Sequence, residues 1–465
     1  MAEKVRIRWA FIIGLIFISS VVMAMVLQRS LVWGIYGTIF LALMILNKSG
    51  VGLMTSLSWI RQGILDAKEV YGLIILIGLN VSMWIASGIV PTLIYFGFEV
   101  IHGMNFLPMA FIVSGVLAFF LGTGLGAIST IGIVLFTLGI SINIPGGLLL
   151  GTLVSGAYIA DRMSPISALA NFTMKVLNIN FRTYFIKMLK IMVPTILLSL
   201  LFYSLIGLGY QEELHAEDVL SYQGILEELF VISPLLLAIP LGVLWLSFRK
   251  ISSSYVLLFG IVTGFIAAMG LQGMSLGEGL SSLLFGFRSP INHDFIQRLE
   301  IGGALQMIEV VLVVMGGIAL SKIYEGCGWI TPVIEGIKRR SRDQRGLIWN
   351  TGILSIILNA LTCDQTVGIL IPGKHLVEPF ERLGMNREDL GVIIANTGTA
   401  FAPLMPWNVN AIIIYTITGV SALSYGKFAF LNWLAFPMVL LVSTEMGRMI
   451  LNFKALRYKK QTLKR

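Results

Sequence analysis

Charged residues are scarce in this chain of 465 residues, of which 12% are charged and 56% are hydrophobic. A soluble domain usually carries about 25% charged residues. Apolar runs follow one another along the whole sequence, and each is long enough to supply the roughly 20 residues that cross a bilayer. These runs do not alternate in polarity as the strands of a membrane barrel do. The composition therefore predicts an all-α polytopic membrane protein.

Cysteine is almost absent, since only Cys327 and Cys363 occur, and this excludes a disulfide framework or a zinc-binding spacing. The sequence also lacks the phosphate-binding pattern Gly-x4-Gly-Lys-Ser/Thr, so it gives no support for ATP-driven pumping. It has no His-Glu-x-x-His motif, and its one Gly-x-Ser-x-Gly match, Gly273–Gly277, follows an apolar span instead of a strand. We therefore expect no enzyme and no cofactor, but a secondary active transporter.

The excess of positive charge indicates the orientation in the membrane. The net charge is +9, and in a membrane protein Lys and Arg are concentrated in cytoplasmic loops. No nucleic-acid partner is needed to explain them, and none is expected. The loop 210–228 has six acidic residues and no Lys or Arg, so we place it outside. This predicts a multi-pass protein of the cell membrane with both termini in the cytoplasm.

That orientation requires about ten transmembrane helices. Two further apolar segments, 105–141 and 346–371, must return to the side they entered, which predicts two re-entrant hairpins; the alternative for 105–141 is two short spans. Their tips, Gly122–Thr130 and Leu361–Gly368, are rich in Gly, Ser and Thr, as suits irregular backbone packed within protein. Arg288 and Arg298 are left outside. The ten spans are expected at 10–27, 31–47, 70–96, 146–160, 188–209, 229–248, 252–272, 301–325, 391–416 and 428–450.

Two parts of the chain resemble each other, which predicts an inverted repeat, the architecture of many secondary transporters. The segment Gly88–Gly97 matches Gly317–Gly326 at five of ten positions, and SGAYIADRMSP lies over NTGTAFAPLMP at a spacing of 241 residues. A parallel repeat or a chance likeness is the alternative. The predicted division is 1–69 for the N-terminal helices, 70–170 for the first unit, 171–300 for the connecting helices, 301–416 for the second unit and 417–465 for the last helix and basic tail.

The first candidate site follows a long uncharged stretch. From His102 to Ala160 there is no Asp, Glu, Lys or Arg, and SGAYIADRMSPIS then introduces Asp161 and Arg162. A carboxylate in a membrane segment is costly and usually marks an ion or proton pathway. Asp161 is therefore a candidate for binding Na⁺ when ionised and a proton when neutral. The alternative is a cytoplasmic helix end where Asp161 pairs with Arg162. We interpret Arg162 primarily as a charge partner of Asp161, and only secondarily as a residue that contacts an anion.

The second candidate carboxylate is Asp364, at the predicted tip of the second hairpin. The alternative role for Asp364 is that of a turn cap, which Asp commonly fills. We predict that Na⁺ binds at Asp161 and Asp364, with further tip residues at Thr123, Ser129 and Thr362.

Neutral oxygens come from the segment NTGTAFAPLMPWN. Hard cations such as Na⁺ prefer oxygen ligands, including carbonyls that are freed where a helix breaks. Pro403 and Pro406 are expected to produce such a break; the alternative is a kinked helix with packing threonines. The candidate ligands are Asn396, Thr397, Thr399 and Asn408.

One more acid, Glu309, lies in the apolar run GGALQMIEVVLVVMGG without a cation nearby in the sequence. An isolated acid in a membrane segment is a candidate proton carrier. The alternative is a lumen-facing polar residue beside Gln306.

The motifs SGAYIADRMSPIS, CDQTVGILIPG and GTAFAPLMPWN resemble those of the NhaC family of Na⁺/H⁺ antiporters, and the likeness runs from about Val70 to Leu440. The resemblance implies an inverted repeat with hairpins and Na⁺ movement coupled to protons. It favours Asp161, Ser164, Asp364, Thr399 and Asn408 as site residues. The sequence departs from the family pattern at Ala160, where Gly is expected, at Arg162, where Lys is expected, and at Cys363–Thr366, where Gly-Asp-Gln-Tyr is expected.

We accordingly predict an antiporter that exchanges Na⁺ for H⁺. The alternative is an Na⁺/H⁺-coupled exchanger of organic acids, because the family it resembles includes malate/lactate exchangers. The expected partners are Na⁺, H⁺, membrane lipid and, in the alternative, a small carboxylate; a homodimer is left open.

Overall fold

The computed structural model of the chain describes residues 2–27, 29–101, 104–210, 216–249, 251–290, 293–297, 299–328 and 330–443. Within these ranges the protein is helical and has no strand. Seven of the described helices are long and apolar enough to cross a membrane, or nine if each of two bent pairs counts as one span. The prediction of an all-α polytopic membrane protein is confirmed, whereas the count of about ten spans stays a prediction. Arg298, the end of the last predicted span and the basic tail lie outside the described residues.

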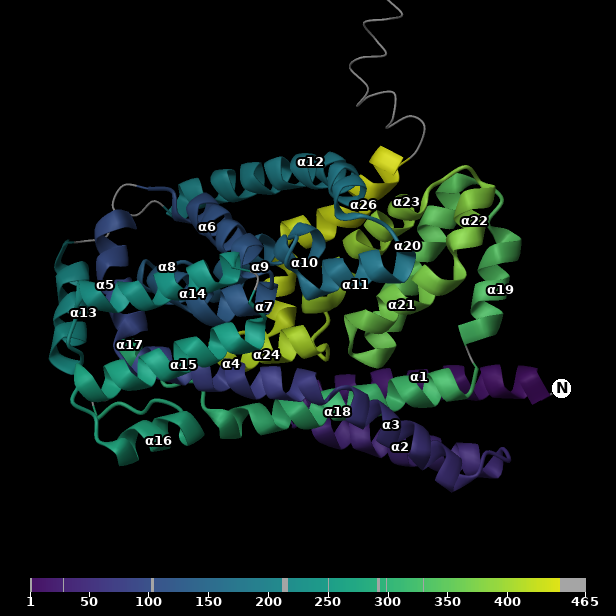
Figure 1. Ribbon diagram of the computed structural model, residues 1–465, viewed down its shortest axis with the longest axis horizontal. Helices are drawn as coiled ribbons and strands as arrows, with labels where there is room; N and C mark the ends of the chain where they lie inside the picture. The colour runs from purple at the N-terminus through teal and green to yellow at the C-terminus, as the bar shows by residue number, and fades with distance from the viewer. Residues whose placement is uncertain are drawn as a thin grey trace, which may run out of the picture.

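The N-terminal helices pack around one long helix from the second half of the chain. That helix, α18, contacts α2, α3 and α4, and α1 lies against α2. Figure 1 shows α1, α4 and α18 along one long side of the molecule, with α12 along the opposite side. The bounds are α1 Ala2–Val26, α2 Leu31–Lys48, α3 Leu53–Asp66, α4 Lys68–Ala86, α5 Ile89–Ile101 and α18 Ala304–Gly326.

The first polar segments lie in a series of short and broken helices. A helical hairpin turns at Gly122 and Thr123, between α6 and the helix that continues through α7 and η1 to α8. Further along, α9 is followed by a single helical turn, α10, that ends at Ser164 in an extended conformation. The bounds are α6 Phe106–Leu121, α7 Gly124–Ala127, the π-helical η1 Ile128–Gly132, α8 Ile133–Ser141, α9 Gly146–Ala157, α10 Ala160–Met163, α11 Ala168–Leu177 and α12 Phe181–Gly207.

The second half contains a similar series. Its hairpin is interrupted at Cys363 and Asp364, and the helix that begins at Arg387 passes through a π-helical segment before it breaks at Met405. The bounds are α19 Ile330–Arg340, α20 Gln344–Thr362, α21 Gln365–His375, α22 Val377–Arg382, α23 Arg387–Ile394, η4 Ala395–Thr399, η5 Ala402–Leu404, α24 Val409–Thr418, α25 Ala422–Tyr425, η6 Gly426–Phe428 and α26 Phe430–Ser443.

The helices between the two series in the sequence lie toward the end of the molecule opposite α20 and α21 (Figure 1). Here α14 packs on α15 and α6, while α15 packs on α4. Their bounds are η2 Leu208–Tyr210, α13 Ala216–Leu229, η3 Pro234–Leu237, α14 Ala238–Phe248, α15 Ser253–Gly270, α16 Leu276–Phe285 and α17 Asp294–Gln297.

Special backbone positions recur 241 residues apart in the two series. Non-glycine residues rarely adopt positive φ, yet each of the three that do among the described residues lies 241 positions from a glycine with positive φ. The interval also relates the starts of α7 and α21, α9 and α23, α11 and α24, and α12 and α25. This recurrence supports the predicted repeat, while its inverted orientation stays a prediction. The three pairs are Gly122 (φ 74°) with Cys363 (φ 57°), Asn143 (φ 59°) with Gly384 (φ 72°), and Asn178 (φ 53°) with Gly419 (φ 70°).

Two details of the predicted organisation are wrong. The expected span 70–96 is two helices, α4 and α5, because Gly88 takes a left-handed conformation (φ 78°) that ends the first of them. The alignment of Gly88–Gly97 with Gly317–Gly326 is also wrong, since the first segment begins at this break and the second lies inside α18. The left-handed residue that follows α18 is Gly328. Apolar, glycine-containing helices look alike even where they are not equivalent.

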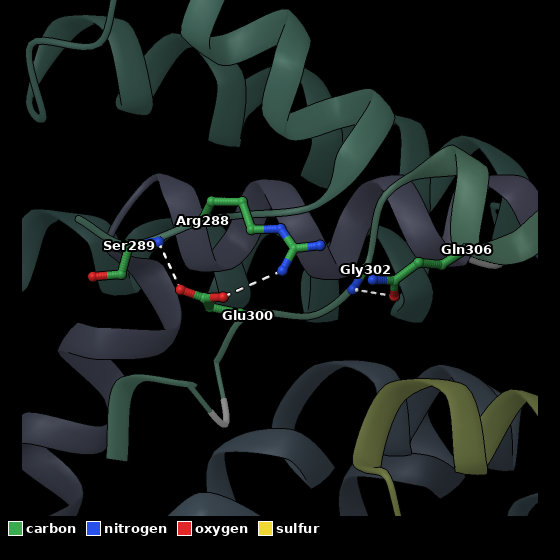
Figure 2. Close-up of polar contacts among 5 residues, drawn as sticks. All are labelled: Arg288, Ser289, Glu300, Gly302 and Gln306. Atoms are coloured by element: carbon green, nitrogen blue, oxygen red, sulfur yellow. Dashed lines mark hydrogen bonds and ion pairs between the residues drawn. The ribbon is translucent and has the colours of Figure 1, made fainter. Parts of the chain in front are cut away.

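The loop between α16 and α18 is closed by polar contacts (Figure 2). Arg288 Nη1 lies 3.3 Å from Glu300 Oε2, and the backbone N–H of Ser289 donates to Glu300 Oε1 at 3.0 Å. The N–H of Gly302 donates to Gln306 Oε1 at 3.1 Å. Arg288, which the predicted topology leaves outside, therefore has a carboxylate partner at the exposed end of the loop.

Candidate functional site

Asp161 links the broken helix α10 to the tip of the first hairpin. Asp161 is only 5% exposed, and its Oδ1 accepts a hydrogen bond from the backbone N–H of Gly124 at 3.2 Å. Gly124 is the first residue of α7, where free N–H groups point outward. Thr123, the predicted tip residue that directly precedes α7, makes no capping hydrogen bond with its side chain. Asp161 thus caps the start of α7 although it belongs to a different segment of the chain.

Arg162 does not form an ion pair with its neighbour. Among the described residues no carboxylate oxygen lies within 4.0 Å of its guanidinium, although Arg162 is fully buried. Its Nε donates to the carbonyl of Tyr158 at 3.0 Å, Nη1 lies 3.8 Å from the sulfur of Met192, and Nη2 has no partner. The guanidinium therefore points toward α12, the helix that carries Met192.

The second carboxylate, Asp364, caps the second hairpin from within. It is the N-cap of α21: Oδ1 accepts from the N–H of Thr366 at 3.0 Å, and Oδ2 contacts the Thr366 hydroxyl. Thr362 donates to the carbonyl of Asp364 at 3.0 Å and to Leu358 at 2.8 Å. The capping role that was the alternative for Asp364 is present. It does not exclude ion binding, because the carboxylate has no cationic partner within 4.0 Å among the described residues.

A chain of buried amides connects this hairpin to the break before α24. Asn408 Nδ2 donates to Asn359 Oδ1 at 2.7 Å, and Asn359 Nδ2 donates to the carbonyl of Gly398 at 2.6 Å. Asn408 Oδ1 in turn accepts from the backbone and side chain of Asn410 at 3.0 and 2.8 Å. The N–H of Val409 also donates to the carbonyl of Cys363 at 3.2 Å. The hairpin tip and the break are therefore one hydrogen-bonded unit.

Replacement of Asn359 by alanine is expected to destabilise the protein. The change removes both hydrogen bonds of Asn359 and leaves the carbonyl of Gly398 and the amide of Asn408 buried without that partner. Stranded buried polar groups cost about 1–3 kcal/mol each. Thermal unfolding of the purified protein in detergent should show a lower apparent Tm. Asn350→Ala, on the same helix but bonded only to Ser341 near the surface, should change it little; equal shifts would contradict this account.

Unpartnered oxygens lie in and beside η4. A π-helical turn alters the backbone pairing of a helix and is frequent at functional sites. Asn396 Oδ1, Thr399 Oγ1 and Gln365 Oε1 are buried and have no hydrogen-bond donor among the described residues. Thr397, in contrast, uses its hydroxyl within the helix by donating to Ile393 at 2.7 Å. Three oxygens from η4 and α21 thus lack a hydrogen-bond donor and stay candidates for cation ligands.

The two series pack across each other, and this brings the polar segments together. The helix that follows the first break, α11, packs on α21 of the second hairpin, and α24 packs on α7, η1 and α8 of the first. Between them, η4 contacts α10, α20 and α21. The segment with Asp161 therefore lies against η4, which in turn lies against the hairpin with Asp364.

Some predicted site residues are placed otherwise. Glu309 is on an exposed face of α18 beside the exposed Leu305 and Ile308, and is not part of this cluster. Ser129 donates to the carbonyl of Gly126 at 3.1 Å inside its own helix. Ser164 holds its break in place by donating to the carbonyl of Phe119 at 2.6 Å.

Sequence reasoning missed Asn359, Asn410 and Gln365. Asn359 had a usable signal, since it is an amide within the apolar run SIILNALT, where polar side chains need a partner. Asn410 and Gln365 lie close to predicted site residues in the sequence. Their positions depend on how the chain folds at the breaks before α24 and α21, which local sequence does not reveal. Broken hairpins that gather carboxylates and buried amides are the architecture of a secondary transporter.

The comparison with known proteins agrees with that class. The chain matches the Na⁺/H⁺ antiporter family over residues 156–444, and it belongs to this family. It is 27% identical over 368 residues to the Na(+)/H(+) antiporter NhaC of Alkalihalophilus pseudofirmus, which covers 79% of each chain. It is 25% identical over 404 residues to the Malate-2H(+)/Na(+)-lactate antiporter of Bacillus subtilis, which covers 86% of each chain.

A third relative differs in its named cargo. The Arginine/ornithine antiporter ArcD of Halobacterium salinarum is 25% identical over 378 residues, which is 80% of this chain and 77% of that one. The matches confirm the resemblance to the NhaC family and the prediction of an antiporter. The residues that bind the cargo stay a prediction.

Proposed function

We propose that this protein exchanges Na⁺ for H⁺ across the cell membrane and that Asp161 and Asp364 carry the ions. The observation that supports this most strongly is the buried carboxylate of Asp161, which has no cationic partner within 4.0 Å among the described residues and is hydrogen-bonded to the tip of the first hairpin. A buried charge without a partner is expensive. Binding a proton or a sodium ion removes that cost, and membrane acids of this kind usually lie on ion pathways.

Competition between the two ions is sufficient for exchange. An ionised carboxylate attracts Na⁺, whereas a protonated one offers the cation no charge. Asn396, Thr399 and Gln365 provide buried oxygens without donors, as a dehydrated Na⁺ requires. Each carboxylate then carries either Na⁺ or H⁺, and movement of the broken segments exposes the site alternately to the two sides.

The orientation in the membrane is part of the same proposal. The basic loops and both termini lie in the cytoplasm, because Lys and Arg concentrate on that side. Membrane lipid surrounds the exposed apolar faces, of which Trp33 on α2 and Leu197 on α12 are examples.

The proposal is tested in inside-out membrane vesicles from a host whose own exchangers are deleted. Vesicles are acidified by respiration, and the internal pH is followed with a fluorescent dye. Addition of Na⁺ should release protons from vesicles that contain the protein and not from empty ones. No response to Na⁺ with protein present in the membrane would contradict the proposed exchange.

A second candidate, exchange of small organic acids coupled to these ions, is favoured by Arg162. Its guanidinium is fully buried next to Asp161 and leaves Nη2 without a partner, as a carboxylate ligand would require. One relative is named as a malate/lactate antiporter. The same vesicles should therefore be tested with Na⁺ alone and with Na⁺ plus malate or lactate. A response that requires the organic acid selects this second function.

A further inference from the structure

One hydrogen bond occurs twice, at equivalent places in the two series. The hydroxyl of Tyr184 on α12 donates to the carbonyl of Arg162 at 2.8 Å. The hydroxyl of Tyr425 on α25 donates to the carbonyl of Pro403. The two tyrosines are 241 positions apart, and so are the two carbonyls. Both tyrosines are fully buried, and each is the fourth residue of its helix.

Each carbonyl needs an outside donor for the same reason. The residue three positions later is a proline in both cases, Pro165 and Pro406, and proline has no N–H to offer a tight helical turn. Among the described residues, no backbone N–H outside the regular helical pattern donates to either carbonyl. A buried carbonyl without a hydrogen-bond donor destabilises the break. The tyrosine hydroxyl supplies the missing donor.

The two breaks are next to the candidate ion ligands. The carbonyl of Arg162 follows Asp161 directly, and the carbonyl of Pro403 lies in η5, between Thr399 and Asn408. Both breaks have a second anchor: Ser164 donates to the carbonyl of Phe119 at 2.6 Å, and Trp407 Nε1 donates to the carbonyl of Ala360 at 2.8 Å. The two donors are 243 residues apart, so only the carbonyls that accept are at equivalent positions. Phe119 and Ala360 are again 241 residues apart. The anchors fix one side of each break, and the tyrosines fix the other.

We propose that Tyr184 and Tyr425 are a matched pair of positioning residues that hold the two helix breaks at the ion site. This inference rests on the proposed Na⁺/H⁺ exchange for its kinetic consequence. Neither hydroxyl binds the ion, since each is donated to a backbone carbonyl. If either hydroxyl is lost, the backbone at the adjoining break is no longer held in place. The candidate ion ligands beside that break, Asp161 in one case and Thr399 and Asn408 in the other, then shift.

The variants Tyr184→Phe and Tyr425→Phe remove only the hydroxyl. For each, the KM for Na⁺ in vesicles is expected to rise by about two- to twelvefold, as the loss of one hydrogen bond of about 0.5–1.5 kcal/mol implies. The maximal rate should change much less. Tyr203→Phe is the matched control, because Tyr203 is also fully buried on α12 and hydrogen-bonded to Ser155 and to the carbonyl of Phe428. These contacts lie at the bend between η6 and α26, and not at either of the two breaks that adjoin the candidate ion ligands.

A purely structural role predicts a different pattern. In that case all three variants lower the apparent Tm and leave the KM unchanged, and such a result would overturn the proposal. An increase of the KM for Tyr184→Phe and Tyr425→Phe, but not for Tyr203→Phe, supports it.

A second measurement separates this inference from the proposed function. Hydrogen–deuterium exchange of the purified protein reports on the breaks without any transport. Tyr184→Phe should speed exchange over residues 162–168 and Tyr425→Phe over residues 403–410, while Tyr203→Phe should leave both segments unchanged. If the wild type does not exchange Na⁺ for H⁺, this pattern still tests the pair. Unchanged protection in both breaks would refute the positioning role even in an active antiporter.

Discussion

Asp161→Asn is expected to abolish Na⁺-driven proton release from inside-out vesicles. The asparagine has nearly the same shape, and its amide oxygen can still accept the hydrogen bond from Gly124 that now reaches Asp161 at 3.2 Å. The first hairpin therefore keeps its connection to α10. What is lost is the only group on α10 that can alternate between a negative charge and a bound proton. Because Na⁺ binding and proton binding both need this change, the rate should fall to that of vesicles without the protein.

The control for this variant is another capping aspartate. Asp343 is exposed at the start of α20, where it accepts a hydrogen bond from the N–H of Gly346 at 3.3 Å. Asn and Asp are similarly good N-caps, so Asp343→Asn should keep both the fold and the exchange. If Asp161→Asn were as active as Asp343→Asn while equally abundant in the membrane, Asp161 would have no part in ion binding.

The second large effect is expected for Asp364→Asn, which should also abolish exchange. Here the capping role is internal to the hairpin, since Asp364 accepts from the N–H of Thr366 at 3.0 Å. Asparagine preserves this cap, so the apparent Tm should fall only slightly. The titratable charge at the tip of the second hairpin is removed. The measurement is the Na⁺-induced change of internal pH, together with the amount of inserted protein.

A pair of variants separates the cap from the charge at Asp364. Asp364→Ala removes both and should lose exchange and also stability, by about 1 kcal/mol for the missing cap. Asp364→Asn should lose exchange alone. Exchange that survives in Asp364→Asn but fails in Asp364→Ala would show that Asp364 serves only as a cap.

The sequence was sufficient to predict the helical membrane class and the places where the two hairpins turn. Runs of apolar residues and the tip compositions located the hairpins, and the structure interrupts them at Gly122–Thr123 and Cys363–Asp364. The same geometry explains why the family pattern has glycine where this chain has Cys363. This residue has φ 57°, a conformation that glycine adopts without strain.

The partners of the polar side chains could not be predicted from the sequence. Arg162 follows Asp161 in the chain, and adjacency suggested an ion pair. Successive residues of a helix point in different directions, however, and the guanidinium turns to Tyr158 and Met192. The amide chain through Asn359 depends in the same way on how α20 meets the break before α24, which no local pattern encodes.

The limits of the membrane spans could not be predicted from local sequence patterns either. Hydropathy alone joined α4 and α5 into one segment, because a single left-handed glycine, Gly88, does not interrupt an apolar run. The constant spacing of 241 residues, in contrast, was visible in the pair SGAYIADRMSP and NTGTAFAPLMP. It extends in the structure from the first hairpin to the starts of α12 and α25.

The central claim is that Na⁺ and H⁺ compete for the same two carboxylates, and proton release on Na⁺ binding tests it most directly. Purified protein in detergent and weak buffer is mixed with NaCl, and the pH is recorded against a choline chloride control. The wild type should release protons in a saturable manner, and the double variant Asp161→Asn/Asp364→Asn should release none. Saturable binding of Na⁺ to the wild type without proton release, or equal release from the double variant, would contradict the account.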